Sequence, residues 1–90
     1  MLRWPVVDLG LVLVTPGVLA ALDEAWVAEL LARHQGGDWG DVAAEDRRLN
    51  DQALKNGARL FSAYETAAGR IWIITEADRS ATTVLLRTEY

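Results

Sequence analysis

Residues 59–88 read RLFSAYETAAGRIWIITEADRSATTVLLRT and contain three runs of aliphatic, aromatic and β-branched residues. The runs cover residues 59–65, 70–76 and 81–88, and short segments at 66–69 and 77–80 separate them. Runs of this length and composition are typical of β-strands, and connections this short join antiparallel neighbours. This part of the chain therefore predicts a three-strand antiparallel meander.

The middle run carries IWII at residues 71–74, which is apolar at every position. Such a run suits a central strand covered on both faces, or a strand that meets a second subunit on one of them. Because Trp4, Trp26 and Trp72 add large apolar side chains, a homodimer is one expectation.

The residues before the meander predict one strand and two or three helices, since the first helix could run on into the second. An aliphatic run at residues 6–14 predicts the strand, and Thr15-Pro16 then supplies a capping hydroxyl and a proline at the first helical position. The expected helices cover residues 16–23, 24–34 and 42–56. Asp41 is expected to cap the third helix and Gly57 to end it. Together these elements predict an α+β fold, a single domain over residues 1–90 with the helices packed on one face of the sheet.

Composition excludes several classes of function. With 9 Lys+Arg against 13 Asp+Glu, the 90-residue chain has a net charge of -4, so no direct nucleic-acid binding is expected. The chain has no cysteine, which excludes disulfide scaffolds, zinc fingers and thiol nucleophiles and agrees with a reducing cytoplasm. The uncharged run at residues 9–22 is shorter than the about 20 residues that cross a bilayer, so no membrane association is expected. No phosphate loop, dinucleotide fingerprint or nucleophile elbow is present, and no cofactor is expected.

The third predicted helix carries two polar residues in the middle of its apolar side. At about 100° per residue, Val42, Leu49 and Ala53 flank Asp46 and Asn50 on the side that should face the sheet. A buried carboxylate or amide is costly without a partner, so both residues should have specific ones. They are expected either to tie the helix to the sheet or to belong to a site.

His34 and the glycine-rich segment that follows it form a second candidate. Asp38, Trp39 and Asp41 lie among three glycines, and Trp39 either anchors a partner or folds back as a lid on the core. His34 is either a satisfied structural histidine or, with Asp46, a proton-transfer pair or metal-ligand set. A hard-cation site that adds Asp38 and Asp41 is a further alternative, although the four residues match no known ligand spacing.

The turn at residues 77–80 is a third candidate. Arg79, with the hydroxyl groups of Ser80, Thr82 and Thr83, has the chemistry to bind an anion, and Asp78 could orient the guanidinium. The alternative is a polar turn followed by residues with high strand propensity.

Three parts of the chain carry a resemblance to a known family. They are HQGGDWGD at residues 34–41, then Glu45, Asp46, Asn50 and Gly57, then WIITEADRSATT at residues 72–83 with the terminal Glu89-Tyr90. Over roughly residues 9–90 the sequence resembles small bacterial proteins, often plasmid or mobile-element encoded, that are called plasmid-related proteins. It departs from their pattern at Arg87-Thr88 and at residues 23–26. The resemblance implies no catalytic residue.

These observations favour a small cytoplasmic accessory or interaction protein, associated with a mobile element, that binds a protein partner. Its expected binding residues are His34, Asp38, Trp39, Asp41, Asp46, Asn50, Asp78 and Arg79. One alternative is a small-ligand or metal-dependent enzyme that uses His34 and Asp46. Another is an anti-defence protein that inhibits a nuclease complex, which the acidic charge and the resemblance would suit.

Overall fold

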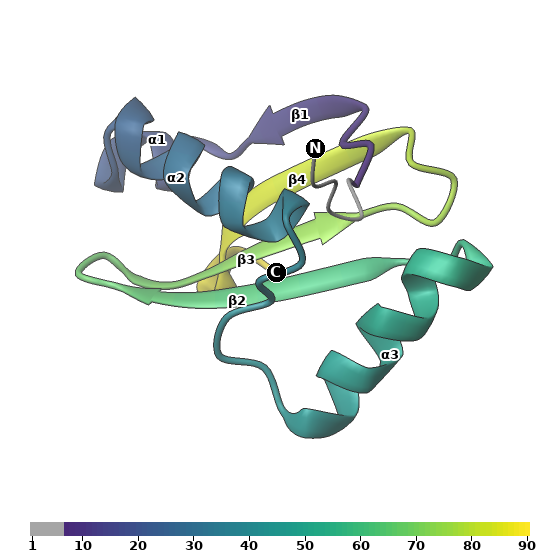
Figure 1. The fold of residues 1–90 in the computed structure, drawn as a ribbon. Helices are drawn as coiled ribbons and strands as arrows, with labels where there is room; N and C mark the ends of the chain where they lie inside the picture. Colours follow the sequence, from purple (N-terminus) through teal and green to yellow (C-terminus); the bar gives the residue numbers. More distant parts are fainter. Residues whose placement is uncertain (1–6) are drawn as a thin grey trace, which may run out of the picture.

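The computed structural model describes residues 7–90, which form an α+β fold around a four-stranded mixed sheet (Figure 1). Trp4 and the first residue of the expected N-terminal strand lie outside the described residues. The elements are β1 (Leu11–Val14), α1 (Pro16–Ala21), α2 (Glu24–Gln35), α3 (Ala44–Asn56), β2 (Leu60–Thr66), β3 (Gly69–Thr75) and β4 (Ala81–Leu86), followed by a 3-10 turn (Arg87–Glu89). Their types and order confirm the layout that the sequence predicts.

The sheet has the strand order β1-β4-β3-β2. β2, β3 and β4 form the predicted antiparallel meander, with Leu60 opposite Thr75 and Trp72 opposite Leu85. β1 adds to the far side of β4 in parallel, with Leu11 opposite Ala81. β1 and β2 are therefore the two edges of the sheet.

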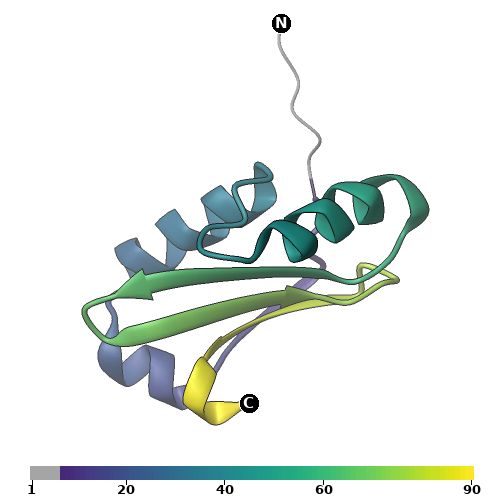
Figure 2. The same ribbon diagram turned by 90° about the horizontal axis from the view of Figure 1, so that it is seen from below.

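α1 and α2 pack over one face of this sheet, and α3 lies along its β2 edge. Figure 2 shows α2 and α3 on the same side of β2 and β3. α1 begins as predicted, with the Thr15 hydroxyl accepting a hydrogen bond from the Val18 N–H. On α2, helical spacing places Val27, Leu30 and His34 on one side, and all three are buried, while Leu31 beside them is half-buried. Two groups of buried apolar residues make the core: one holds Val18, Val27, Leu30, Tyr64, Ile71, Ile73 and Val84, the other Val7, Trp39, Ala53 and Leu60.

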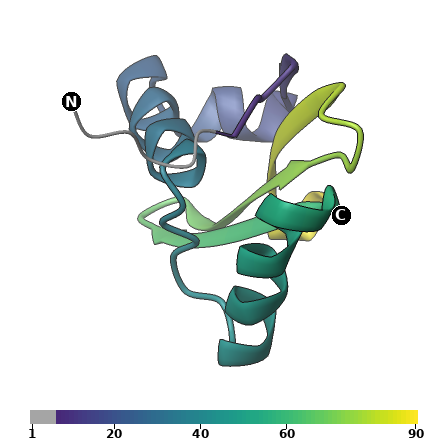
Figure 3. The same ribbon diagram turned by 45° about the vertical axis from the view of Figure 1, so that its right-hand side comes forward.

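α3 differs from its prediction at its start and on its apolar side. It begins at Ala44, and its cap residue Ala43 makes no side-chain capping bond, so Asp41 is not the cap. Leu49 is 49% exposed instead of buried. The reason is position: α3 lies along the outer edge of β2 (Figure 3), so only a narrow strip around Asn50 and Ala53 meets the sheet. Gly57 ends the helix in the left-handed conformation as predicted.

Both ends of the chain also differ from the predicted strands. The first strand starts only at Leu11, because Gly10 adopts a positive φ and donates its N–H to the Asp8 carboxylate. The last strand ends at Leu86, whose N–H binds the Glu89 carboxylate and so turns the chain away from the sheet.

The second face of the sheet carries no helix in residues 7–90. The register places Phe61 beside Ile74, and Trp72 beside Leu85, on this face. Figure 2 shows the C-terminal turn on this side, opposite α2 and α3. We refer to it below as the open face.

Candidate functional site

His34 is fully buried under α2 and forms the centre of a hydrogen-bonded chain. Its Nδ1 lies 2.6 Å from the Ser62 hydroxyl and its Nε2 lies 2.9 Å from the Thr75 hydroxyl. Thr75 in turn contacts the Thr82 hydroxyl at 2.8 Å, and Thr82 donates to the Leu9 carbonyl at 2.7 Å. This chain of hydrogen bonds thus joins α2, β2, β3, β4 and the N-terminal segment.

The direction of this chain fixes the protonation of the imidazole. A carbonyl only accepts, so the single proton of Thr82 points to Leu9. Thr75 must then donate to Thr82, and it accepts from Nε2–H of His34, whose Nδ1 accepts from Ser62. Nε2 of His34 therefore carries a proton. Burial, assisted by the positive charge of Arg79, lowers the pKa of His34 to about 4.

Trp39 is a core residue and does not anchor a partner at the surface. It is 3% exposed, its indole donates to Asp51 at 3.0 Å, and its ring meets His34 edge-on at 5.7 Å between centroids. The segment around it closes the outer edge of β2, since the Trp39 carbonyl accepts from Ala63 and the Asp41 N–H donates to Ala63. Of the two readings that the sequence left open, the lid on the core is the correct one.

Asp38 lies outside this core and is held by Arg33. The Arg33 guanidinium donates to the Asp38 carboxylate at 2.7 Å and lowers the pKa of that carboxyl, while the Asp38 carbonyl accepts from the Tyr64 hydroxyl at 2.6 Å. Arg33 also stacks on the Tyr64 ring, at 4.6 Å from its centroid. Burial raises the pKa of Tyr64 to about 12. This set fixes the segment after α2.

Asn50 and Asp46 lie one turn apart on α3 but have different surroundings. The Asn50 amide donates to the Phe61 carbonyl at 2.6 Å and accepts from the Phe61 N–H at 3.1 Å, which pairs both outward backbone groups of that residue. Asn50 is therefore the tie between helix and sheet that the sequence predicted as one option. Asp46 is half-buried at the rim of a pocket on the open face.

Arg79 caps the C-terminal end of α3 and is not available to an anion. Its guanidinium donates to the carbonyls of Ala53 at 3.1 Å and Ala58 at 2.7 Å, and to two carbonyls of its own turn. Asp78 does not orient it, because the Asp78 carboxylate accepts instead from the Ser80 N–H. The structure therefore supports the polar-turn reading, with a cation placed where the helix dipole favours one.

The predicted residues do not gather into one site. The partners of His34 are hydroxyl groups, and Asp46 lies at the open-face pocket, so the two do not form the proton-transfer pair that the sequence suggested. Among residues 7–90 no group of three or more His, Asp or Glu side chains is placed to hold a metal ion, which removes the hard-cation alternative. Asp41 and Asp46 line the same cavity.

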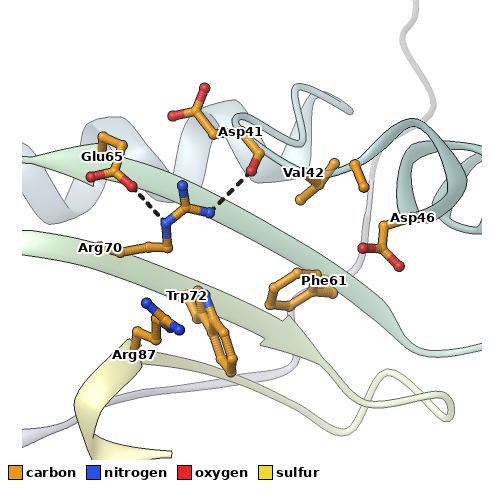
Figure 4. Close-up of a pocket in the computed structure, with 9 residues that line it drawn as sticks. Asp41, Val42, Asp46, Phe61, Glu65, Arg70, Trp72 and Arg87 are labelled. Carbon is orange, nitrogen blue, oxygen red and sulfur yellow. Dashed lines mark hydrogen bonds and ion pairs between the residues drawn. The ribbon is translucent and has the colours of Figure 1, made fainter.

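That cavity, the open-face pocket, has a volume of about 510 Å³. Its lining residues are Asp41, Val42, Ala43, Asp46, Phe61, Glu65, Arg70, Trp72 and Arg87 (Figure 4). Arg70 is already engaged, since it pairs with Glu65 at 2.5 Å and donates to the Asp41 carbonyl at 3.2 Å. The ion pair of Arg70 and Glu65 therefore forms one side of the pocket.

Aromatic rings form the floor of the pocket. Phe61 and Trp72 meet at 86° with 5.0 Å between their centroids, and Tyr90 contacts the Trp72 ring at 5.1 Å. The Trp72 indole N–H is buried and has no hydrogen-bond acceptor among residues 7–90. Arg87 is exposed beside it (Figure 4) and makes no ion pair with the described residues. The pocket thus offers an exposed cation next to the half-buried rings of Phe61 and Trp72, whereas the Trp72 N–H is itself covered.

Sequence reasoning missed this pocket because its residues come from separate strands. Phe61, Arg70, Trp72 and Arg87 lie on one face only through the pairing of β2 with β3 and the turn after β4. Their alternation within each strand was the available signal, but it shows neither which strands are adjacent nor which face the helices leave open.

Comparison with known protein families, characterised proteins and solved structures finds no match for this chain. Within residues 7–90, no helix is both long and apolar enough to cross a membrane.

Proposed function

We propose that the protein is a small interaction module that binds a protein partner through the open-face pocket. The observation that carries the proposal is the exposed Arg87 guanidinium, which makes no ion pair within residues 7–90, beside the half-buried rings of Phe61 and Trp72. Trp, Tyr and Arg are the residue types that contribute most often to binding energy at protein interfaces. A guanidinium without an ion pair beside them favours an occupant that brings a carboxylate.

The charges around the pocket define the chemistry of the partner. Arg87 favours a carboxylate, whereas Asp41 and Asp46 on the opposite rim favour an amide or a cation. A peptide segment that places an acidic side chain next to an aromatic or aliphatic one meets these requirements. The rim carboxylates and the net charge of -4 disfavour a nucleic-acid backbone.

An enzymatic function has less support, because the pocket contains no histidine and its lining offers no nucleophile beside a base. A cytoplasmic location agrees with the absence of cysteine, and an accessory role on a mobile element rests on the resemblance alone. No feature of the described residues supports a nuclease complex as the partner.

The test is a titration with defined peptides, followed through the four tryptophan indole N–H signals in ¹H–¹⁵N spectra. A short peptide with Glu beside Phe is expected to shift the Trp72 signal, and a peptide with Lys in place of Glu to bind about tenfold more weakly. Arg87→Gln should remove this preference. Lys55→Gln, on the exposed side of α3, is the matched control and should keep the preference for the Glu peptide. Equal binding of both peptides, or binding that Arg87→Gln leaves unchanged, would contradict the proposal.

A further inference from the structure

The outer edge of β1 is unpaired along residues 7–90. The N–H groups of Leu11 and Thr15 donate to the carbonyls of Ser80 and Val84, so these residues point their backbone groups at β4. Backbone groups alternate along a strand, and those of Val12 and Val14 therefore point away from the sheet. These two residues present two N–H donors and two C=O acceptors at the edge.

The opposite edge of the sheet is closed at Phe61 and Ala63. The outward groups of Phe61 pair with the Asn50 amide, and those of Ala63 pair with the backbone of Trp39 and Asp41. Native sheets usually protect their edges in this way, because an open edge templates further strand pairing. β1 is the edge without such protection.

The side chains of β1 are also exposed and uncharged. Leu11 is 65% exposed, Val12 38% and Leu13 46%. No charged residue occurs between positions 9 and 22, so nothing on the strand selects a charged partner or repels a copy of itself. Proteins normally place a lysine or a proline on a free edge strand, and β1 has neither.

We propose that β1 pairs antiparallel with β1 of a second copy, about a twofold axis at Leu13, so that two sheets join into one of eight strands. In this register Val12 of each copy faces Val14 of the other, and all four outward donors and acceptors of each strand are paired. The two Leu13 side chains meet on the open face at the axis. Any other partner at this edge would have to supply an uncharged strand of matching length.

A strand of four residues buries little surface, so the dimer should be weak and depend on concentration. The mass of the full chain in analytical ultracentrifugation should rise toward that of a dimer between about 10 µM and about 500 µM. Leu13→Lys should remain monomeric over this range, because it places two like charges at the axis. Leu49→Lys on α3, where the native side chain is 49% exposed, is the matched control and should dimerise as the native chain does.

Cysteine cross-linking tests the register, since the native chain has no cysteine. A non-hydrogen-bonded antiparallel pair brings Cα atoms to about 4.5 Å, which a disulfide can span. Leu13→Cys should therefore form a disulfide-linked dimer under mild oxidation, much faster than Leu49→Cys. A monomer at every concentration, a dimer that survives Leu13→Lys, or equal cross-linking of both cysteine variants would each overturn the proposal. None of these results depends on peptide binding at the open-face pocket.

Discussion

Protonation of the one histidine should destabilise the fold as the pH falls. The pKa of His34 is about 4 in the folded protein, against 6.5 for an ordinary histidine. Between pH 4 and pH 6.5 the unfolded chain therefore binds a proton at His34 that the folded chain does not bind. The stabilisation is fully present above pH 6.5 and is lost as the pH falls toward 4.

The magnitude follows from the two pKa values. Their difference of about 2.5 corresponds to about 3 kcal/mol of unfolding free energy, since one pKa unit is worth about 1.4 kcal/mol. This is a large part of the about 5–15 kcal/mol that holds small domains folded. The physical cause is burial, which disfavours the charged imidazolium, assisted by the positive charge of Arg79.

The assay is urea unfolding of the native chain and of His34→Gln at several pH values between 7 and 4. A glutamine amide offers one donor toward Thr75 and one acceptor toward Ser62, and it does not titrate. The carboxyl groups titrate in both proteins, so the difference between them isolates His34. We expect the native chain to lose about 3 kcal/mol more than the variant over this range.

The pKa itself is open to direct measurement, because the ring protons of a single histidine can be followed by NMR. A folded-state pKa near 6.5 would refute the reasoning. So would an unfolding free energy that depends on pH to the same extent in the native chain and in His34→Gln.

Three further substitutions test the packing. Trp39→Ala should cost about 3–5 kcal/mol in urea unfolding because the ring is buried, and a loss below about 1 kcal/mol would return it to the surface role. Asn50→Ala should cost about 1–3 kcal/mol of unfolding free energy, because it leaves the Phe61 backbone groups unpaired. Gln52→Ala, on the exposed side of α3, should change the unfolding free energy by less than about 0.5 kcal/mol. Equal effects of the two substitutions would contradict the role of Asn50 in joining α3 to β2. Gly40→Ala should cost about 1–3 kcal/mol more unfolding free energy than Gly57→Ala. Both glycines have a positive φ, but only at Gly40 would a Cβ overlap β2. Similar losses for the two variants would count against this close approach of Gly40 to β2.

The strands and helices could be predicted because their signals are local. The alternation in residues 59–88 and the short segments between the runs define a meander wherever it folds, and Thr15-Pro16 and Gly57 mark helix ends through their own backbone preferences. The buried stripe on α2 was predictable for the same reason, since helical spacing alone places its residues on one side.

The candidate site could be predicted only in part. The sequence indicated that Asn50 needs a specific partner, because an amide in an apolar strip is costly, but it could not name the backbone of β2 as that partner. It also ranked Trp39 and Arg79 as binding residues. Both are used internally, Trp39 by the core and Arg79 by the end of α3.

By itself, the sequence determined the element types, the meander and the polar residues that require partners. Only the tertiary structure decided that β1 pairs with β4, that α3 lies along the edge of β2, and that Phe61 and Trp72 share an open face. The physical reason is that periodicity and capping act within a few residues, whereas strand order and the covered face depend on contacts between distant segments. The open-face pocket and the free β1 edge both result from these contacts between distant segments.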